Sequence, residues 1–293
     1  MARAQRRGMP SRRLLARGAL GLVVGAALAG CSGTFAGIAG TSPGATTSAP
    51  GHTSGVSVRS SAPIPTVSPT TPLPPPSAPP TEWRAGPTVA GVDVSPYQRT
   101  VDWAGLWASG HRFAIVKASE GSTWRSPVYA AQRDAARAVG MMVGAYHYAR
   151  PSSSSAIAQA RHFVAVSGGW TADGRTLPGA LDLERNTSGD PCYGMTPAQL
   201  TAWIADFSGE YSRLTTRVPM IYVRADLWAQ CLAGDRTIGA TNPLWLYDHE
   251  APVGPWPHGW ERPTIWQRGV EANLDRNVFF GTEADLVRFA TAI

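Results

Sequence analysis

From residue 89 onward, short apolar runs alternate with longer segments of helical periodicity. Eight runs have the length and composition of buried strands: Val89–Val94, Phe113–Ala118, Met142–Tyr148, Gly179–Leu183, Pro219–Val223, Leu244–Tyr247, Thr264–Gln267 and Leu274–Phe279. Five segments are predicted to be helices: Trp103–Ser109, Ser126–Val139, Ser153–Val166, Thr196–Leu214 and Thr282–Ala292. Such alternation favours a mainly parallel sheet.

The segment Thr196–Leu214 has the most regular helical pattern. Thr196 can cap its N-terminus, and Pro197 suits the first helical position. Apolar residues recur at helical spacing: Leu200, Ile204, Phe207, Tyr211 and Leu214.

Eight strands separated by helices predict a closed α/β barrel. The last three strands fall within residues 244–279, which leaves few residues for helices between them. We therefore expect a modified TIM-like β/α barrel whose last helices are reduced or missing. An open doubly wound sheet is the competing fold. Such a fold would typically have a glycine-rich phosphate-binding turn after the first strand, where this chain has Asp93-Val94-Ser95-Pro96.

Residues 1–30 are expected to be an export signal. Six arginines and no acid precede the apolar stretch Gly18–Gly30, which is too short to span a bilayer. Ser11–Leu15 resembles a twin-arginine signal, although the general secretory route stays open. Leu28–Cys31 resembles a lipobox, which would make Cys31 a lipidated residue and anchor the exported chain to the membrane. An ordinary cleaved signal with a coincidental cysteine is the alternative.

Residues 31–87 are rich in Ser, Thr, Pro, Gly and Ala and are expected to form a disordered tether. As a flexible coil this segment would span roughly 40 Å; a passive stalk is the alternative. Residues 88–293 are long enough for one domain with a large core.

Charge and cysteine content narrow the function further. The net charge of +6 equals the six leader arginines, so the remaining chain is neutral and gives no support for nucleic-acid binding. Cys192 and Cys231 are expected to form a disulfide in an exported protein. They have no CxxC spacing and the six histidines are scattered, so we expect no metal and no cofactor.

The candidate chemistry centres on carboxylates. In a strand, Asp182 and Glu184 point to the same face about 6.6 Å apart along the chain. Asp93 ends the first strand and Asp275 lies in the last, and catalytic groups in β/α barrels sit where strands end. Paired carboxylates of this kind are used in glycoside hydrolysis. The alternatives are a surface acid pair on an edge strand and, for Asp275, a structural pair with Arg276 or a turn cap.

Further polar and aromatic residues near strand ends are candidates for binding a sugar chain: Tyr148, Tyr222, Trp266 and Gln267. Tyr148 and Trp266 could equally belong to the core. Lys117, the one lysine of the chain, is a candidate partner for Glu120 or for another acid of the cleft. Both residues are candidates for substrate binding, and Glu120 is the weaker one. An arginine-biased composition could also explain the single lysine.

Several motifs in order along residues 90–279 together resemble glycoside hydrolase family 25, the Chalaropsis-type lysozymes. They are Gly91-Val92-Asp93-Val94-Ser95 with Tyr97-Gln98, Phe113–Gly121, Gly144–Ala149, Leu181-Asp182-Leu183-Glu184, Ile221-Tyr222, Leu244-Trp245, Ile265-Trp266-Gln267 and Asp275-Arg276-Asn277. Two segments depart from the family pattern: Leu246–His249, where small residues are usual, and Ala272–Leu274 before the closing motif.

The resemblance implies cleavage of the β-1,4 bond between N-acetylmuramic acid and N-acetylglucosamine in peptidoglycan. It implies that Glu184 is the general acid, with a pKa raised by acids such as Asp182. Asp182 would orient the substrate's 2-acetamido group or stabilise the positive charge that this group acquires. Asp93 and Asp275 would complete an acidic floor. An inverting route, with Asp182 or Asp93 as the base, stays open.

The expected partner is peptidoglycan, bound by a monomer. A catalytically inactive peptidoglycan-binding lipoprotein is the alternative function. An amidase that cuts the peptide stem is a further alternative, but such enzymes normally need a zinc cluster, which this sequence does not offer. Whether the protein remodels its own wall or attacks other cells, and which glycan modifications it prefers, stay open.

Overall fold

The structure is a computed structural model that describes residues 86–249 and 254–292. The expected signal, Cys31 and nearly all of the tether lie outside the described residues. The strands are β1 (Thr88–Val94), β2 (His111–Glu120), β3 (Trp124–Arg125), β4 (Met142–Tyr148), β5 (Ala180–Asp182), β6 (Met220–Val223), β7 (Leu244–Tyr247), β8 (Ile265–Glu271) and β9 (Leu274–Phe280). The helices are α1 (Trp103–Ala108), α2 (Tyr129–Ala138), α3 (Ala156–Ser167), α4 (Pro197–Thr215), α5 (Ala225–Leu232) and α6 (Glu283–Thr291).

Eight of these strands form a closed barrel. Parallel pairs run in order through β1, β2, β4, β5, β6, β7 and β8. The last strand, β9, pairs antiparallel with both β8 and β1 and so closes the sheet. The two-residue strand β3 pairs with the end of β2 and is not part of the barrel wall.

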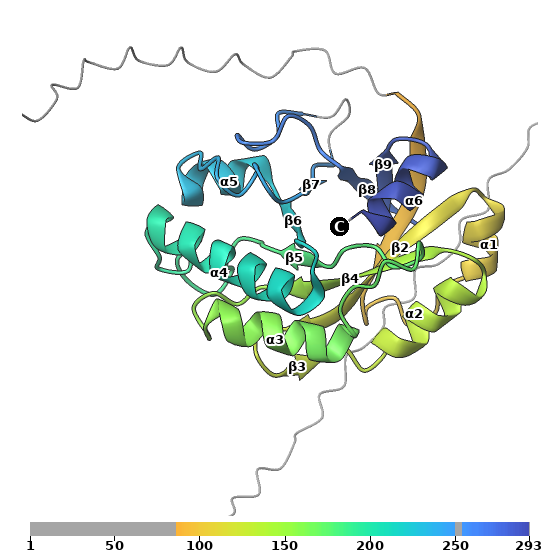
Figure 1. Ribbon diagram of the computed structural model, residues 1–293, viewed down its shortest axis with the longest axis horizontal. Helices are drawn as coiled ribbons and strands as arrows, with labels where there is room; N and C mark the ends of the chain where they lie inside the picture. Colours follow the sequence, from red (N-terminus) through yellow and green to blue (C-terminus); the bar gives the residue numbers. More distant parts are fainter. Residues whose placement is uncertain (1–85, 250–253, 293) are drawn as a thin grey trace, which may run out of the picture. The chain divides into compact units, whose positions relative to one another are not determined.

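The expected α/β barrel with reduced last helices is confirmed. In the described parts of the chain, no helix lies between β7 and β8, and β8 and β9 are joined by a tight turn at Ala272 and Asn273, both at positive φ. Figure 1 shows α2, α3 and α4 along one side of the barrel and α6 beside β8 and β9. Helix α5, which has only eight residues, and the two-residue strand β3 were not predicted.

Alternating side chains divide the apolar residues between two cores, as strand geometry requires. One set fills the barrel interior: Val89, Phe113, Ile115, Ala180, Met220, Trp245, Ile265 and Phe279. The other packs under the helices, and includes Val92, Val116, Leu181, Ile221 and Leu246. Gly91 is required by this packing, because a Cβ there would lie 2.4 Å from the ring of Phe113.

Local interactions hold the outer elements. Thr196 caps α4 in a reciprocal capping box with Gln199, with Pro197 at its start, as expected. Leu214, at the other end of that pattern, is 39% exposed rather than buried. The expected disulfide between Cys192 and Cys231 is present and ties the segment after β5 to α5. None of the helices in the described residues is long and apolar enough to span a membrane.

Candidate active site

A cavity of about 540 Å³ opens where the parallel strands end. It brings together most of the residues singled out from the sequence: Asp93, Lys117, Glu120, Tyr148, Asp182, Glu184, Tyr222, Gln267 and Asp275. Asp275 reaches this rim because β9 is antiparallel, so its beginning, rather than its end, lies beside the end of β1. The acids therefore converge from both ends of the domain sequence.

Trp266 is the exception among the candidate residues. Gln267 faces the cavity, so the preceding side chain points to the other face of β8. The indole N–H of Trp266 donates to the backbone oxygen of Asp248 at 2.5 Å, and its ring stacks on Phe280. The structure does not place Trp266 where it could stack on a sugar in this cavity.

Asp93 lies in a chain of hydrogen bonds on the cavity floor. Its Oδ2 accepts from the amides of Gln267 at 2.8 Å and Asn277 at 2.7 Å. The oxygens of these two amides are also hydrogen-bonded. The Gln267 oxygen accepts from the hydroxyl of Tyr222, and the Asn277 oxygen accepts from the indole N–H of Trp245. The indole N–H of Trp245 can only donate, so it fixes the orientation of the Asn277 amide.

The pKa of Asp93 is raised to about 8. Burial is the main cause and the charge of Asp275 adds to it, while the hydrogen bonds from Asn277 and Gln267 act in the opposite direction. Burial also raises the pKa of Asp275. This part of the floor therefore binds a proton that isolated aspartates would release.

Asp182 is buried between two neighbouring parallel strands, β4 and β6. This rules out a surface acid pair on an edge strand. Its pKa is raised well above the usual range, first by burial and then by the charge of Glu184. Among the described residues, its Oδ1 is buried without any hydrogen-bond partner. An N–H group of a ligand could satisfy this atom.

Glu184 lies two residues beyond β5. The amide of Leu183 still bonds to the carbonyl of Tyr222 at 3.0 Å, so the extended backbone continues and Glu184 faces the cavity like Asp182. Burial is the largest cause of its raised pKa; Lys117 and Arg150 lower it, and Asp275 raises it. Burial, rather than the expected repulsion from Asp182, is thus the main cause of the raised pKa of Glu184.

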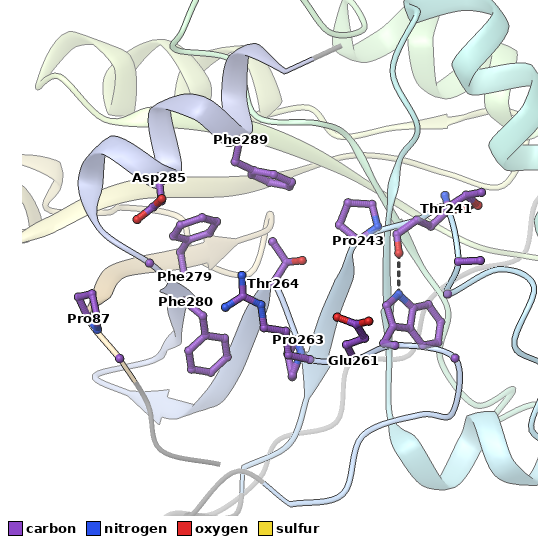
Figure 2. A pocket seen from close by; sticks show the side chains of 18 residues that line it. Pro87, Thr241, Pro243, Glu261, Pro263, Thr264, Phe279, Phe280, Asp285 and Phe289 are labelled. Atoms are coloured by element: carbon purple, nitrogen blue, oxygen red, sulfur yellow. Dashed lines mark hydrogen bonds between the residues drawn. The ribbon is translucent and has the colours of Figure 1, made fainter. Parts of the chain in front are cut away.

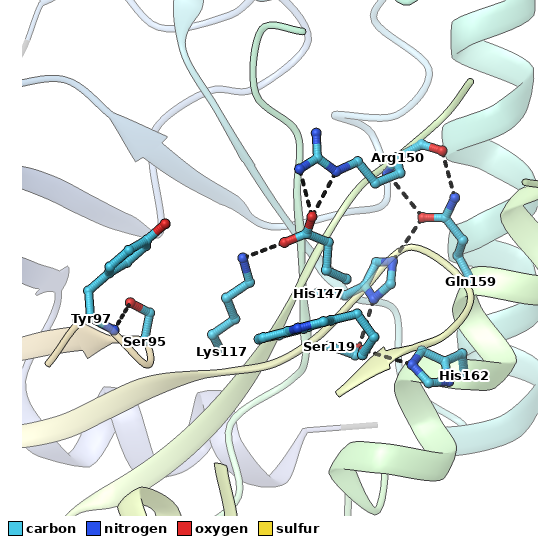
Figure 3. Close-up of polar contacts among 10 residues, drawn as sticks. Ser95, Tyr97, Lys117, Ser119, His147, Arg150, Gln159 and His162 are labelled. Carbon is cyan, nitrogen blue, oxygen red and sulfur yellow. Dashed lines mark hydrogen bonds and ion pairs between the residues drawn. The ribbon is translucent and has the colours of Figure 1, made fainter. Parts of the chain in front are cut away.

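Lys117 pairs with Glu120, as expected. Its Nζ lies 2.8 Å from Oε2 of Glu120, and Arg150 holds Oε1 through two nitrogens at 2.9 and 2.6 Å (Figure 3). Burial alone would raise the pKa of Glu120, but these hydrogen bonds outweigh it and lower the pKa. Glu120 is therefore a charged anchor for two cations beside the cavity, and a poor proton donor.

A buried chain of polar groups supports Arg150 from below (Figure 3). His147 contacts Ser119 at 2.8 Å and Gln159 at 3.0 Å, and Gln159 in turn bonds to both backbone groups of Arg150. Burial lowers the pKa of His147 to about 4, so the ring is neutral. It supports the rim and does not reach the cavity.

Sequence reasoning missed several residues that line the cavity: Tyr97, Tyr146, Arg150, Trp245, Tyr247 and His249. The strand period of two held the signal for some of them. Tyr146 precedes Tyr148 by two positions on β4, and Trp245 and Tyr247 alternate on β7. Tyr222 packs against both Trp245 and Tyr247. These rings form an aromatic wall that begins beside Asp182, the register neighbour of Tyr222, as in sites that bind sugars.

A larger cavity, of about 830 Å³, lies at the other end of the barrel, where β8 begins and β9 ends (Figure 2). Its wall includes Thr264, Phe280 and Phe289, and its acids are the exposed Glu261 and the helix-capping Asp285. The described residues that line it include no cluster of buried carboxylates. Chemistry rather than volume therefore identifies the smaller cavity as the candidate active site.

The comparisons with known proteins agree with this geometry. The family model of glycosyl hydrolases family 25 matches residues 92–273. The chain belongs to glycosyl hydrolase family 25. It is therefore a glycoside hydrolase.

Two curated relatives of this family show how far the similarity extends. Lysozyme M1 of Streptomyces globisporus is 38% identical over 209 residues, covering 69% of this chain and 71% of that protein. The N,O-diacetylmuramidase of Chalaropsis sp. is 42% identical over 184 residues, covering 61% and 87%. Among solved structures, the muramidase from Trichobolus zukalii is 40% identical with a TM-score of 0.68, covering 70% of this chain and all of that one.

Proposed function

We propose that this family 25 protein hydrolyses the β-1,4 bond between N-acetylmuramic acid and N-acetylglucosamine in peptidoglycan. The observation that carries the proposal is the pairing of Glu184, whose raised pKa keeps a proton available, with the buried Asp182, whose Oδ1 is without a partner among the described residues. Relatives named lysozyme and muramidase support the same substrate.

In this proposal Glu184 is the general acid. It gives its proton to the glycosidic oxygen as the bond to the sugar's C1 breaks, and burial keeps the proton on the acid until then. It then removes a proton from the water that attacks C1. Aromatic rings of the wall, from Tyr222 and Tyr247, would hold the sugars against these groups.

Asp182 would act through the 2-acetamido group of the substrate. The acetamido oxygen attacks C1 from the opposite face, and the N–H of this group binds the unpartnered Oδ1 of Asp182. When Glu184 holds the proton, its charge no longer raises the pKa of Asp182, and the ionised Asp182 stabilises the positive charge that the acetamido group acquires. Water then opens the ring intermediate. The configuration at C1 is retained, an exception to the scheme with two catalytic carboxylates.

Asp93 is less suited than Asp182 to serve as a base for an inverting reaction. Its Oδ2 already accepts two amide hydrogen bonds, and its carboxylate faces Asp275. We propose that Asp93 and Asp275 position the substrate and tune Glu184. All four acids line the cavity, whereas an inactive binding protein would be free to lose them.

The chemistry of the products tests the function. The purified protein is incubated with peptidoglycan, and new reducing ends and new amines are both measured. We expect reducing ends that belong to N-acetylmuramic acid. New amines alone would indicate an amidase, and binding without products would indicate an inactive tether; either result would refute the proposal.

We also propose that residues 1–30 export the chain and that residues 31–87 connect a lipid-anchored Cys31 to the barrel as a tether. The arginine-rich leader and the lipobox-like Leu28–Cys31 support this. An anchored monomer would then act on nearby cell wall. Cys31→Ala should move the protein from the detergent phase to the aqueous phase, and unchanged partitioning would contradict the anchor.

A further inference from the structure

A second, smaller pocket opens beside Glu184. It has a volume of about 240 Å³ and shares Glu184, Tyr222 and Tyr247 with the candidate active site. Because three residues line both spaces, the pocket adjoins the candidate active site. A group attached to a bound sugar chain could enter it next to the proton donor.

The floor of this side pocket is apolar. Leu183 and Leu227 are buried in its wall, and the ring of Tyr247 stacks on Tyr222 with centroids 5.8 Å apart. Such a surface suits methyl and methylene groups better than bare hydroxyls.

The rim of the side pocket is positively charged. Arg224 contacts Asp226 through Nε at 3.0 Å, and Arg185 lies 3.9 Å from the same carboxylate. Two guanidinium groups thus face one carboxylate, which leaves one positive charge in excess. The guanidinium of Arg224 also lies over the ring of Tyr247, 5.0 Å from its centroid.

Both arginines remain accessible to a ligand. The side chains of Arg185 and Arg224 are 43% and 52% exposed. Since Nε of Arg224 is held by Asp226, its two terminal nitrogens are oriented and can bind a second carboxylate in the bidentate manner of guanidinium groups.

We infer that this side pocket binds the carboxylate-bearing group on O3 of the N-acetylmuramic acid residue, with Arg224 and Arg185 as its ligands. The inference rests on the proposed function. That group is a lactyl ether, whose methyl fits the apolar floor, and it carries either a free carboxylate or a short acidic peptide. In a cavity that cleaves next to this sugar, the group must leave the glycan close to Glu184.

Three soluble glycans separate the sources of the carboxylate. The first keeps its peptide stems. The second has been treated with an amidase, which exposes the lactyl carboxylate. The third is the second after conversion of that carboxylate to a neutral amide. Release of reducing ends gives kcat and KM for the wild type and for Arg224→Gln and Arg185→Gln.

We expect Arg224→Gln to raise KM about 3- to 10-fold on a carboxylate-bearing glycan, as for the loss of a partly exposed charged hydrogen bond. Its kcat should change little, and KM on the neutral glycan should not change. An effect on the first glycan alone assigns the pocket to the peptide, and an effect on the second alone assigns it to the lactyl group. Equal effects on charged and neutral glycans, or no effect on any, would overturn the inference.

Matched controls exclude a loss of folding. Arg213→Gln removes an arginine that pairs with Glu210 on α4 through Nε in the same way. Arg213 does not line this pocket, so the change should leave every KM unchanged. Arg224→Lys keeps the charge and should recover part of the affinity. Sodium chloride should raise the wild-type KM on the charged glycans only. A wild type that cuts none of the three glycans would refute the proposed function itself.

Discussion

Asp93 on β1 and Asp275 on β9 are register partners in the antiparallel pair that closes the barrel. This places two carboxylates opposite each other at the rim, although they come from the first and last strands. Together with burial, the charge of Asp275 raises the pKa of Asp93 to about 8. The closing strand thus contributes directly to the electrostatics of the candidate active site.

Asp93→Asn should stabilise the protein at alkaline pH. The folded state holds a proton on Asp93 up to about pH 8, whereas the unfolded chain releases it near 3.8. Stability from this group is therefore full below pH 3.8 and falls as the pH rises towards 8. An asparagine keeps an oxygen for Gln267 and Asn277 but has no proton to lose. Melting temperatures between pH 4 and 9 should decline less steeply in the variant.

Asp134→Asn is the matched control for this experiment, because Asp134 is exposed and forms a surface ion pair with Arg133 on α2. Its melting curve should follow the wild type. If Asp93→Asn and the wild type lose stability in parallel as the pH rises, the account of Asp93 is wrong. The stabilised variant should also lose activity, as is common for strained active sites.

Lys117→Met should move the pH profile of activity to higher pH. Lys117 lowers the pKa of both Glu184 and Asp182. Without it both carboxyl groups release their protons at higher pH, so the two limbs of the kcat/KM profile should shift in the same direction. Arg213→Met serves as the control, and an unshifted profile would show that Lys117 does not act on these acids.

Asp182→Asn tests the participation of the substrate. The change removes the charge that stabilises the acetamido group, so kcat on N-acetylated glycan should fall about 100-fold, by analogy with the loss of one preorganised electrostatic group. Chemically de-N-acetylated glycan lacks the group on which Asp182 acts and should be a poor substrate for both proteins. Equal rates of the wild type on the two glycans would exclude this mechanism.

Removal of the Cys192–Cys231 disulfide should reduce stability by about 4 kcal/mol on the chain-entropy model. The bond closes a loop of 39 positions that includes α4 and β6. Denaturant unfolding of the double serine variant measures the loss. A reductant should lower the stability of the wild type towards that of this variant, and should not change the stability of the variant itself.

The features that were predicted correctly from the sequence are those that follow from local strand periodicity. Asp182 and Glu184 share a face because their spacing is two, and the apolar runs gave β4 and β7 with the right bounds. The same period shows why Trp266 failed as a candidate, since its neighbour Gln267 occupies the inner face.

Other features depend on contacts between distant segments. The direction of β9 is set by pairing with β1 and β8, and no local pattern distinguishes it from a parallel strand. Arg150 is held at the cavity by hydrogen bonds to Glu120 of β2 and Gln159 of α3. Helix α5 is too short for a reliable periodic signal, although it carries Cys231 of the disulfide.

The proposed mechanism depends most on Glu184, which would give the proton that breaks the glycosidic bond. Release of reducing ends from peptidoglycan should be measured for the wild type, Glu184→Gln and the control Glu261→Gln, an exposed glutamate of the cavity at the other end of the barrel. If Glu184 is the general acid, kcat should fall at least about 100-fold in Glu184→Gln and should not change in the control, with both variants folded. A Glu184→Gln protein that cleaves as fast as the wild type would contradict it.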